Sequence, residues 1–481
     1  MKNLTLVFWV IFCFAFNLLA QDDYQKWLKQ EQEKMKKFKT EEDKKFLEFL
    51  EKEWKAVKTE KSIKPDEKPK SPIPPRIVPT DETIAEKQEV KNVLPPPKIE
   101  EKKEEISPPK IDKKNDEFVS IFNFYGVRAE ITHKKDLFVL LKGKLENKSI
   151  SNYWNDISSQ DYKPLLEQFD YYKEVLGFND LALAKFIYYF AKKNYGEKDN
   201  EAKLFVWFSL LKLGFKARIG IKDDKEILLL LASKEKIYGV PYITQDNERY
   251  YIADFEKPQF ELQGDIYTYE GEFPGVEKKL EMSYEKAPKF DNKLEEKKLK
   301  FKYKGVEYNI TVRYNKNSVD YFYKHPYVEL PVYFKSSPSE FAASSLVNSL
   351  KEIVKDKSET EAANIILRFC QTAFDYKTDQ EQFGWEKPMF IDEILNYEFS
   401  DCEDRTILFI FLVKNILGLD AIAIDYPGHL AAAVKFNSDV QGDFVMFKNQ
   451  KYIICDPTYI NANIGMAMPN FKNVKPEIIA F

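Results

Sequence analysis

Three residues near the C-terminus have the types and the order of a cysteine-based catalytic triad. The first, Cys402, follows Asp401 and precedes an apolar run with helical spacing. The members of that run are Ile407, Phe411, Leu412 and Ile416. Asp401 is therefore expected to cap a helix whose first turn carries the cysteine. Because the unpaired N–H groups and the dipole of a helix start stabilise a thiolate and can receive an oxyanion, we predict that Cys402 is a nucleophile.

A base and an orienting group follow at the ends of expected strands. His429 comes after an expected strand over residues 421–425 and a Pro-Gly turn, and it opens a strand of small residues. The chain has only three histidines, so a histidine at this place after the cysteine is an informative match and not one picked from many. Asp456 follows an expected strand over residues 451–455. Neighbouring strands would bring His429 and Asp456 side by side, facing the helix of Cys402, as a nucleophilic thiol requires.

This arrangement resembles the transglutaminase-like superfamily of papain-like cysteine enzymes, in its exported bacterial type. The resemblance covers about residues 361–459 and rests on Asp401-Cys402-Glu403-Asp404, Gly418 at the helix end, Gly428-His429 and Asp456-Pro457-Thr458. It implies an α+β fold in which helices pack on an antiparallel sheet. It also implies acyl transfer through a thioester, in which an amide carbonyl is attacked and the acyl group passes to water or to an amine.

In this resemblance Cys402 is the nucleophile, His429 is the general base and then the acid, and Asp456 orients the imidazole. Leu430 stands where family members often have an aromatic residue, so the acceptor side of the site differs from theirs. The chain shows no acidic loop cluster of the calcium-binding type. We therefore expect a protein or peptide substrate and neither a metal nor a cofactor.

Each of these residues also has a structural interpretation. Cys370 and Cys455 lie within apolar runs and are interpreted as small buried hydrophobes or as a disulfide pair. A single strand histidine is more often structural than catalytic, and Asp-Pro-Thr is common turn chemistry. The alternative function is therefore a non-catalytic binding or scaffold protein that retains the fold.

An internal repeat of about 200 residues supplies a comparison within the chain. In each copy an apolar helix precedes a second helix, a Leu-Gly pair, two strand-like runs and a further strand that ends in aspartate. In the first copy the cysteine position falls among residues 198–200, and the histidine position falls at Glu226 or Ile227. Only the aspartate persists, as Asp254. The first copy is therefore interpreted as a catalytically degenerate relative.

The composition and the N-terminus bound the remaining possibilities. Lys and Arg number 74 against 78 Asp and Glu, and no folded stretch is dominated by basic residues, which argues against nucleic acid as a partner. The first twenty residues have the pattern of an export signal with a cleavage point after Ala20. The expected location is therefore secreted or periplasmic, with a membrane contact only if the signal stays uncleaved as an anchor.

The 481 residues divide into six expected segments. These are a signal peptide over 1–20, a charged amphipathic helix over 21–61, a disordered linker rich in proline, lysine and glutamate over 62–116, a degenerate transglutaminase-like domain over 117–275, a β-rich bridging segment over 276–335 and a transglutaminase-like catalytic domain over 336–481. The helix over 21–61 is interpreted as a solvated stalk in preference to a docking helix, because its charges are mixed.

Overall fold

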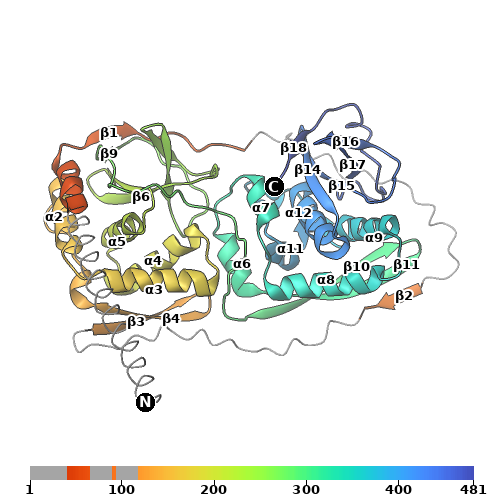
Figure 1. The fold of residues 1–481 in the computed structure, drawn as a ribbon, viewed down its shortest axis with the longest axis horizontal. Coiled ribbons are helices and arrows are strands. Elements are labelled where there is room, and N and C mark those ends of the chain that lie inside the picture. Colours follow the sequence, from red (N-terminus) through yellow and green to blue (C-terminus); the bar gives the residue numbers. More distant parts are fainter. Residues whose placement is uncertain (1–40, 66–88, 94–116) are drawn as a thin grey trace, which may run out of the picture.

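The computed structural model describes residues 41–65, 89–93 and 117–481 of the chain (Figure 1). They form a mixed α+β protein with several sheets, as the sequence predicts. The expected signal peptide lies outside the described residues. Within the described ranges, no helix has the length and apolar character needed to cross a membrane.

The first half of the protein combines a helical layer with two sheets. A helix over residues 41–51 comes first. The strands of this half are β1 (Lys55–Lys58), β3 (Glu117–Phe124), β4 (Val127–Lys134), β5 (Ala217–Lys222), β6 (Glu226–Ala232), β7 (Tyr242–Gln245), β8 (Glu248–Ala253) and β9 (Asp265–Thr268). The helices are η2 (Lys135–Leu137), α2 (Asn147–Ser158), α3 (Lys163–Leu176), α4 (Asp180–Tyr195) and α5 (Asp199–Lys212). Six strands form one sheet in the order β1-β9-β5-β6-β8-β7, and β3 and β4 form a separate hairpin.

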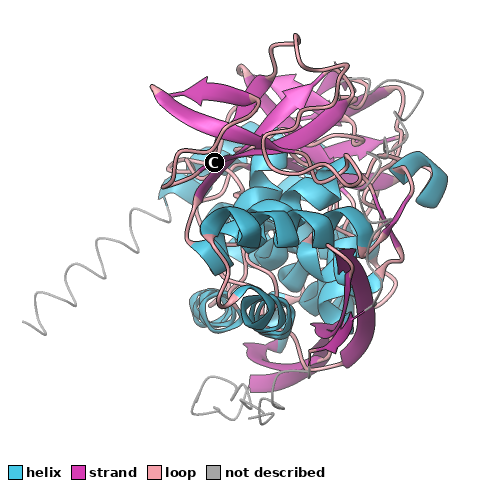
Figure 2. Cartoon of the chain, turned by 90° about the vertical axis from the view of Figure 1, so that its right-hand side faces the viewer, coloured by secondary structure: helices cyan, strands magenta, loops and turns pink. Residues whose placement is uncertain are grey.

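The second half repeats this plan. Its strands are β10 (Leu294–Tyr303), β11 (Val306–Asn315), β12 (Asp375–Tyr376), β13 (Phe399–Ser400), β14 (Asp420–Tyr426), β15 (His429–Lys435), β16 (Phe444–Phe447), β17 (Gln450–Cys455) and β18 (Glu477–Ile479). Its helices are α6 (Lys316–Tyr323), α7 (Leu330–Lys335), α8 (Glu340–Val354), α9 (Glu359–Thr372), α10 (Asp379–Gln382), α11 (Ile391–Asn396), α12 (Cys402–Leu412) and the π-helical turn η3 (Val413–Leu417). The main sheet has the order β16-β17-β15-β14-β18. Figure 2 shows the layers of this half, with strands above and below a layer of helices.

The bridging segment predicted over residues 276–335 is a β-hairpin in its middle and helical toward its end. Its strands β10 and β11 do pair antiparallel, as predicted. However, they match the β3–β4 hairpin of the first copy at a constant offset, which relates Phe122 to Phe301 and Gly126 to Gly305. Residues 316–323 and 330–335 are helical. The repeat unit therefore begins with a hairpin, a feature hidden by the weak identity of the two strand pairs.

The prediction of one charged helix over residues 21–61 is wrong in its described part. The helix ends at residue 51, and residues 55–58 form strand β1, which pairs with β9. Phe46 is fully buried, with its ring 4.8 Å from that of Trp154 and 5.4 Å from that of Tyr269. Because this aromatic face packs into the first half, the segment is part of a folded core and not a solvated stalk.

The linker predicted over residues 62–116 also contains ordered backbone. Strand β2 (Glu89–Asn92) pairs in parallel with β11, and Ile63 forms a bridge with Tyr238. Residues 66–88 and 94–116 lie outside the described residues. Composition did not predict these pieces because each one pairs with a residue far away in the chain, β2 with β11 and Ile63 with Tyr238 in an isolated bridge.

Candidate active site

Cys402 is the first residue of α12, and Asp401 caps this helix as predicted. The Asp401 carboxylate accepts hydrogen bonds from the backbone N–H groups of Glu403, at 3.1 Å, and of Asp404, at 3.4 Å. The Asp404 carboxyl group in turn accepts from the backbone N–H of Asp401 at 3.2 Å. This reciprocal capping box fixes the backbone on both sides of the cysteine.

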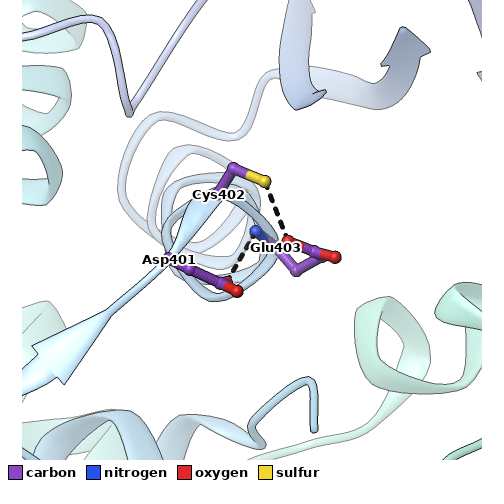
Figure 3. A group of neighbouring side chains, drawn as sticks. All are labelled: Asp401, Cys402 and Glu403. Atoms are coloured by element: carbon purple, nitrogen blue, oxygen red, sulfur yellow. Dashed lines mark hydrogen bonds between the residues drawn. The ribbon is translucent and has the colours of Figure 1, made fainter. Parts of the chain in front are cut away.

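The thiol of Cys402 points toward a neighbouring carboxylate. Its S–H donates to Glu403 Oε2 at 2.8 Å (Figure 3). Both side chains are buried, with 6% of Cys402 and 1% of Glu403 exposed. The sequence reasoning did not identify Glu403 as a partner of the sulfur, because a residue next to the nucleophile in the chain has no fixed direction until the helix is placed.

His429 and Asp456 meet where two neighbouring strands end. His429 is the first residue of β15, and Asp456 follows the last residue of β17, which pairs antiparallel with β15. The distance from His429 Nε2 to Asp456 Oδ2 is 2.8 Å, and both side chains are buried. The structure therefore brings these two predicted residues into direct hydrogen-bond contact.

The same imidazole also interacts with Cys402. Burial alone would lower the pKa of His429, but the negative charge and hydrogen bond of Asp456, followed by the nearby Cys402 side chain, raise this pKa to about 10. Nε2 contacts Asp456, so Nδ1 is the ring nitrogen that is not engaged by the carboxylate. The structure joins His429 and Asp456 directly and places Cys402 in the same buried region, with its thiol on Glu403.

A buried glutamine holds the loop that carries Asp456. Asp456 Oδ1 accepts from the backbone N–H groups of Thr458, at 2.9 Å, and Tyr459, at 3.1 Å. Gln371, on α9, donates from Nε2 to the carbonyl oxygen of Asp456 at 3.1 Å and to that of Ala462 at 3.0 Å. These contacts direct the second carboxylate oxygen of Asp456 to His429. No sequence pattern points to Gln371, which is one of the last residues of a predicted helix.

An arginine and a tyrosine complete the surroundings of the helix start. Arg405 donates to Ser400 Oγ at 3.1 Å and to the carbonyl oxygens of Gln371 and Phe374, which ties α12 to the end of α9. Its guanidinium carbon lies 5.3 Å from the ring centre of Tyr376. Burial, followed by the charge of Cys402, raises the pKa of Tyr376, so its hydroxyl stays protonated near the sulfur.

Aromatic rings close the site on the histidine side. The rings of His429 and Phe471 are stacked, with centres 5.2 Å apart and an angle of 7° between their planes. Phe471 also stacks on Tyr426 at 4.7 Å. Because Cys402 and His429 are both almost entirely buried, a macromolecular substrate could reach the sulfur only after part of this cover moves.

Two groups of side chains have the geometry to hold a metal ion. One consists of Asp401, Cys402 and Glu403, and the other of Asp379, Asp401 and Asp404. In the second group burial and mutual repulsion raise the pKa values of Asp379 and Asp404, and both accept backbone hydrogen bonds, from Lys387 and Met389. This chemistry suits protonated carboxyl groups that organise backbone. That the protein needs no metal stays a prediction.

The other two cysteines of the described region are free thiols. Cys370 and Cys455 are fully buried, and burial raises the pKa of each thiol. Of the two interpretations drawn from the sequence, the small buried hydrophobe holds, and the disulfide pair is not formed.

The first copy carries a different set of groups at the corresponding positions. Helix α5 begins at Asp199, where α12 begins with Cys402, and strand β6 begins at Glu226, where β15 begins with His429. Asp254 Oδ1 accepts from the N–H groups two and three residues later, at 2.9 and 3.1 Å, as Asp456 does. The two copies therefore have the same arrangement of helix start, strand start and aspartate loop, with different side chains at the first two positions.

The chain matches no protein-family model, no curated protein and no solved structure.

Proposed function

We propose that this protein is an exported transglutaminase-like cysteine enzyme that acts on protein or peptide amides through a thioester. The observation that carries the proposal is the contact of His429 Nε2 with Asp456 Oδ2 at 2.8 Å, in a buried site where Cys402 is close enough to help raise the pKa of the imidazole. The cap of α12 fixes the backbone at Cys402, and the loop contacts of Asp456 fix its carboxylate against His429, which supports the roles of nucleophile, base and orienter for the three groups.

The first half-reaction forms the acyl-enzyme. The Cys402 thiolate attacks an amide carbonyl carbon, so a C–S bond forms while the carbonyl oxygen takes up negative charge. The donors proposed for that charge are the backbone N–H of Cys402 at the start of α12 and the hydroxyl of Tyr376, since Asp401 already accepts from the N–H groups of Glu403 and Asp404. The imidazolium of His429 then gives its proton to the leaving nitrogen, the C–N bond breaks and an amine departs.

The second half-reaction regenerates the thiol. Water or an amine attacks the thioester carbonyl, and His429 accepts a proton from the attacking group. The C–S bond breaks, and the proton passes to the sulfur of Cys402. Hydrolysis gives a carboxylic acid, whereas attack by an amine gives a new amide. Asp456 holds the ring and stabilises the imidazolium throughout, without taking the proton.

The proposal extends to the architecture. Each half is proposed to be a papain-like, transglutaminase-like unit, with the second catalytic and the first a degenerate relative. The repeated order of hairpin, helices and antiparallel sheet supports this. Export through the N-terminal signal is part of the same proposal and rests on the sequence pattern.

Selective alkylation tests the central claim. In the native protein, iodoacetamide should modify Cys402 faster than Cys370 and Cys455, because Cys402 begins a helix, lies near His429 and is slightly exposed, whereas the other two thiols are fully buried. Peptide mass spectrometry measures all three sites in one sample. The Cys402→Ala protein, checked for unchanged circular dichroism, should no longer react with a glutamine-mimicking electrophilic peptide. Equally slow labelling of the three thiols would rule out an activated nucleophile.

A second candidate is a non-catalytic binding protein. The observation that favours it is the closed site, in which the thiol of Cys402 donates to Glu403 and Phe471 covers His429. This candidate predicts partner binding that is the same for Cys402→Ala and the wild type. It also predicts no covalent capture of electrophilic peptides.

A further inference from the structure

The outer edge of the second main sheet is apolar and exposed. Strand β16 is the last strand on one side of the order β16-β17-β15-β14-β18. Phe444 is 49% exposed and Met446 is 56% exposed, and both lie on the same face of the strand because their positions alternate. Across the described ranges, no other strand or isolated bridge pairs with this edge.

The backbone of β16 is also available for pairing. A two-residue turn with positive φ at Lys448 and Asn449 joins β16 to β17, so Phe447 and Gln450 close the hairpin as a hydrogen-bonded pair. Hydrogen-bonded and non-hydrogen-bonded pairs alternate along such a hairpin. The N–H and C=O groups of Met446 and Phe444 therefore point outward from the sheet.

The first copy shows what this edge can bind. Its hairpin β7–β8 has the same register, with a two-residue turn of positive φ at residues 246–247 and Tyr242 paired with Tyr251, as Phe444 is paired with Ile453. Tyr242 is thus the counterpart of Phe444. Its carbonyl oxygen accepts from Glu60 N–H at 2.8 Å, and its N–H donates to the Glu60 carbonyl oxygen at 3.4 Å.

An extended segment from outside the repeat unit therefore covers the edge of the first sheet. The antiparallel bridge from Glu60 to Tyr242 is reinforced by Thr244 Oγ1, which donates to the Glu60 carboxylate at 2.5 Å. The same segment begins as β1, which covers the opposite edge at β9. Edges left open attract other strands, and here the chain's own N-terminal segment covers both.

We infer that the β16 edge binds an extended polypeptide segment by antiparallel backbone pairing, as Glu60 binds Tyr242 in the first copy. The exposed side chains of Phe444 and Met446 favour β-branched or aromatic residues opposite them. Lys448, which is exposed in the turn after β16, favours an acidic residue at the start of the bound segment. The Lys451 ammonium lies at the other end of the strand, 2.8 Å from the Val440 carbonyl oxygen and 5.2 Å from the centre of the Phe444 ring. The occupant is thus an apolar strand preceded by acidic residues.

The identification of this segment as part of the substrate rests on the proposed function. A chain antiparallel to β16 runs parallel to β17 and so heads for the end of the sheet where Asp456 and His429 lie. The bound strand would lie three strand spacings from β15, about 14 Å, which an extended chain covers in about four residues. The reacting amide should therefore follow the docked strand by several residues.

Peptide binding to the unreactive Cys402→Ala protein tests the inference without requiring chemistry. The probe is a fluorescein-labelled peptide with two glutamates, then alternating valine and threonine, and a C-terminal glutamine. We expect saturable binding by fluorescence anisotropy below about 1 mM. We also expect slowed amide hydrogen exchange at Phe444 and Met446, with little change at Val445 and Phe447, which already pair with β17. A peptide N-methylated at alternate residues should not bind.

Two protein variants separate backbone pairing from hydrophobic contact. Met446→Pro removes only an outward N–H, a change that edge strands accept, and should weaken binding about tenfold or more. Phe444→Lys should do the same. The matched control is Val119→Lys, an exposed strand residue of the first hairpin, which should leave binding unchanged.

The outcomes are distinguishable from those of the function test. No saturable binding, or equal binding by the N-methylated peptide, overturns the inference even if Cys402 labels selectively. A dimer in light scattering that Phe444→Lys disrupts would show that a second copy occupies this edge, which also overturns the substrate assignment. Alternating protection without any reactivity of Cys402 would keep the docking edge and overturn the proposed enzyme.

Discussion

The two copies of the repeat share one backbone arrangement but carry different functional groups at matching positions. In both, a helix start, a strand start and a loop held by an aspartate follow one another at matching positions. In the first copy Lys203 Nζ lies 3.0 Å from Asp199 and 3.1 Å from Glu226, so the helix-start and strand-start positions are joined by a lysine. In the second copy they hold a thiol and an imidazole. The fold therefore fixes where the groups stand, while the residue types decide what they can do.

The two sites also differ in burial. The side chains of Asp199 and Glu226 are 39% and 53% exposed, whereas those of His429 and Asp456 are 4% and 3% exposed. A solvated ion-pair network costs little to keep and contributes little stability. A buried imidazole-carboxylate pair has a large desolvation cost, and perturbed buried groups of this kind concentrate at functional sites. This contrast favours chemistry in the second copy.

The largest expected effect is on the alkylation rate of Cys402, which should depend on His429 and not on its counterpart in the first copy, Glu226. His429→Ala should slow iodoacetamide labelling of Cys402 at neutral pH by about 100-fold or more, because the imidazolium that stabilises the thiolate is lost. Glu226→Ala should leave the rate unchanged. Time-resolved mass spectrometry of the Cys402 peptide provides the measurement. A similar rate in both variants would remove the proposed difference between the copies.

The next effect is a pH dependence of stability with opposite signs in the two copies. Because the folded pKa of His429 is raised to about 10 from 6.5, its contribution is fully present below pH 6.5 and is lost as pH rises toward 10. The unfolding free energy of wild type relative to His429→Gln should therefore fall by a few kcal/mol between about pH 6 and pH 10. Urea titrations at both pH values test this.

His133, in the first hairpin, supplies the opposite sign. Burial lowers its pKa, and its Nε2 lies 2.7 Å from Ser120 Oγ. Wild type should therefore lose stability relative to His133→Gln as pH falls below 6.5. If both histidine variants shift the pH profile in the same direction, the electrostatic contrast drawn between the two regions is wrong.

The sequence predicted the parts of the site that depend on local pattern. The cap at Asp401, the helix end at Gly418, whose φ is 67°, and the strand starting at His429 all follow from residue preferences at element boundaries. The pairing of His429 with Asp456 followed from the expectation that their strands are neighbours. The repeat itself predicted Asp199 and Glu226 as the counterparts to within one residue.

Other features depend on contacts between distant segments, which periodicity does not encode. Gln371 acts on a loop 85 residues later, and strand β2 exists because β11 offers an edge. Residues 55–58 are a strand because they complete the first sheet, although their composition suits a charged helix. Tertiary pairing overrides local propensity in each case.

A smaller effect concerns the helix caps. Asp401→Ala should lower the unfolding free energy by about 1 kcal/mol, because two N–H groups lose their acceptor. Its counterpart Lys198 caps α5 without a side-chain hydrogen bond, so Lys198→Ala should have no measurable effect. Asp401→Asn, which keeps the acceptor, should retain most of the stability. Equal loss from the alanine and asparagine variants would assign the effect to charge instead of capping.

The smallest effect concerns the residue after each helix start, Glu403 in the second copy and Asn200 in the first. Glu403→Gln removes a negative charge 2.8 Å from the sulfur, and a nearby negative charge disfavours a thiolate. Labelling of Cys402 should become about threefold faster, while Asn200→Ala leaves it unchanged. A slower rate in Glu403→Gln would instead mean that the carboxylate takes the thiol proton itself. The base of the second copy would then be Glu403, and comparing matching positions in the two copies would no longer identify Cys402 and His429 as the reactive pair.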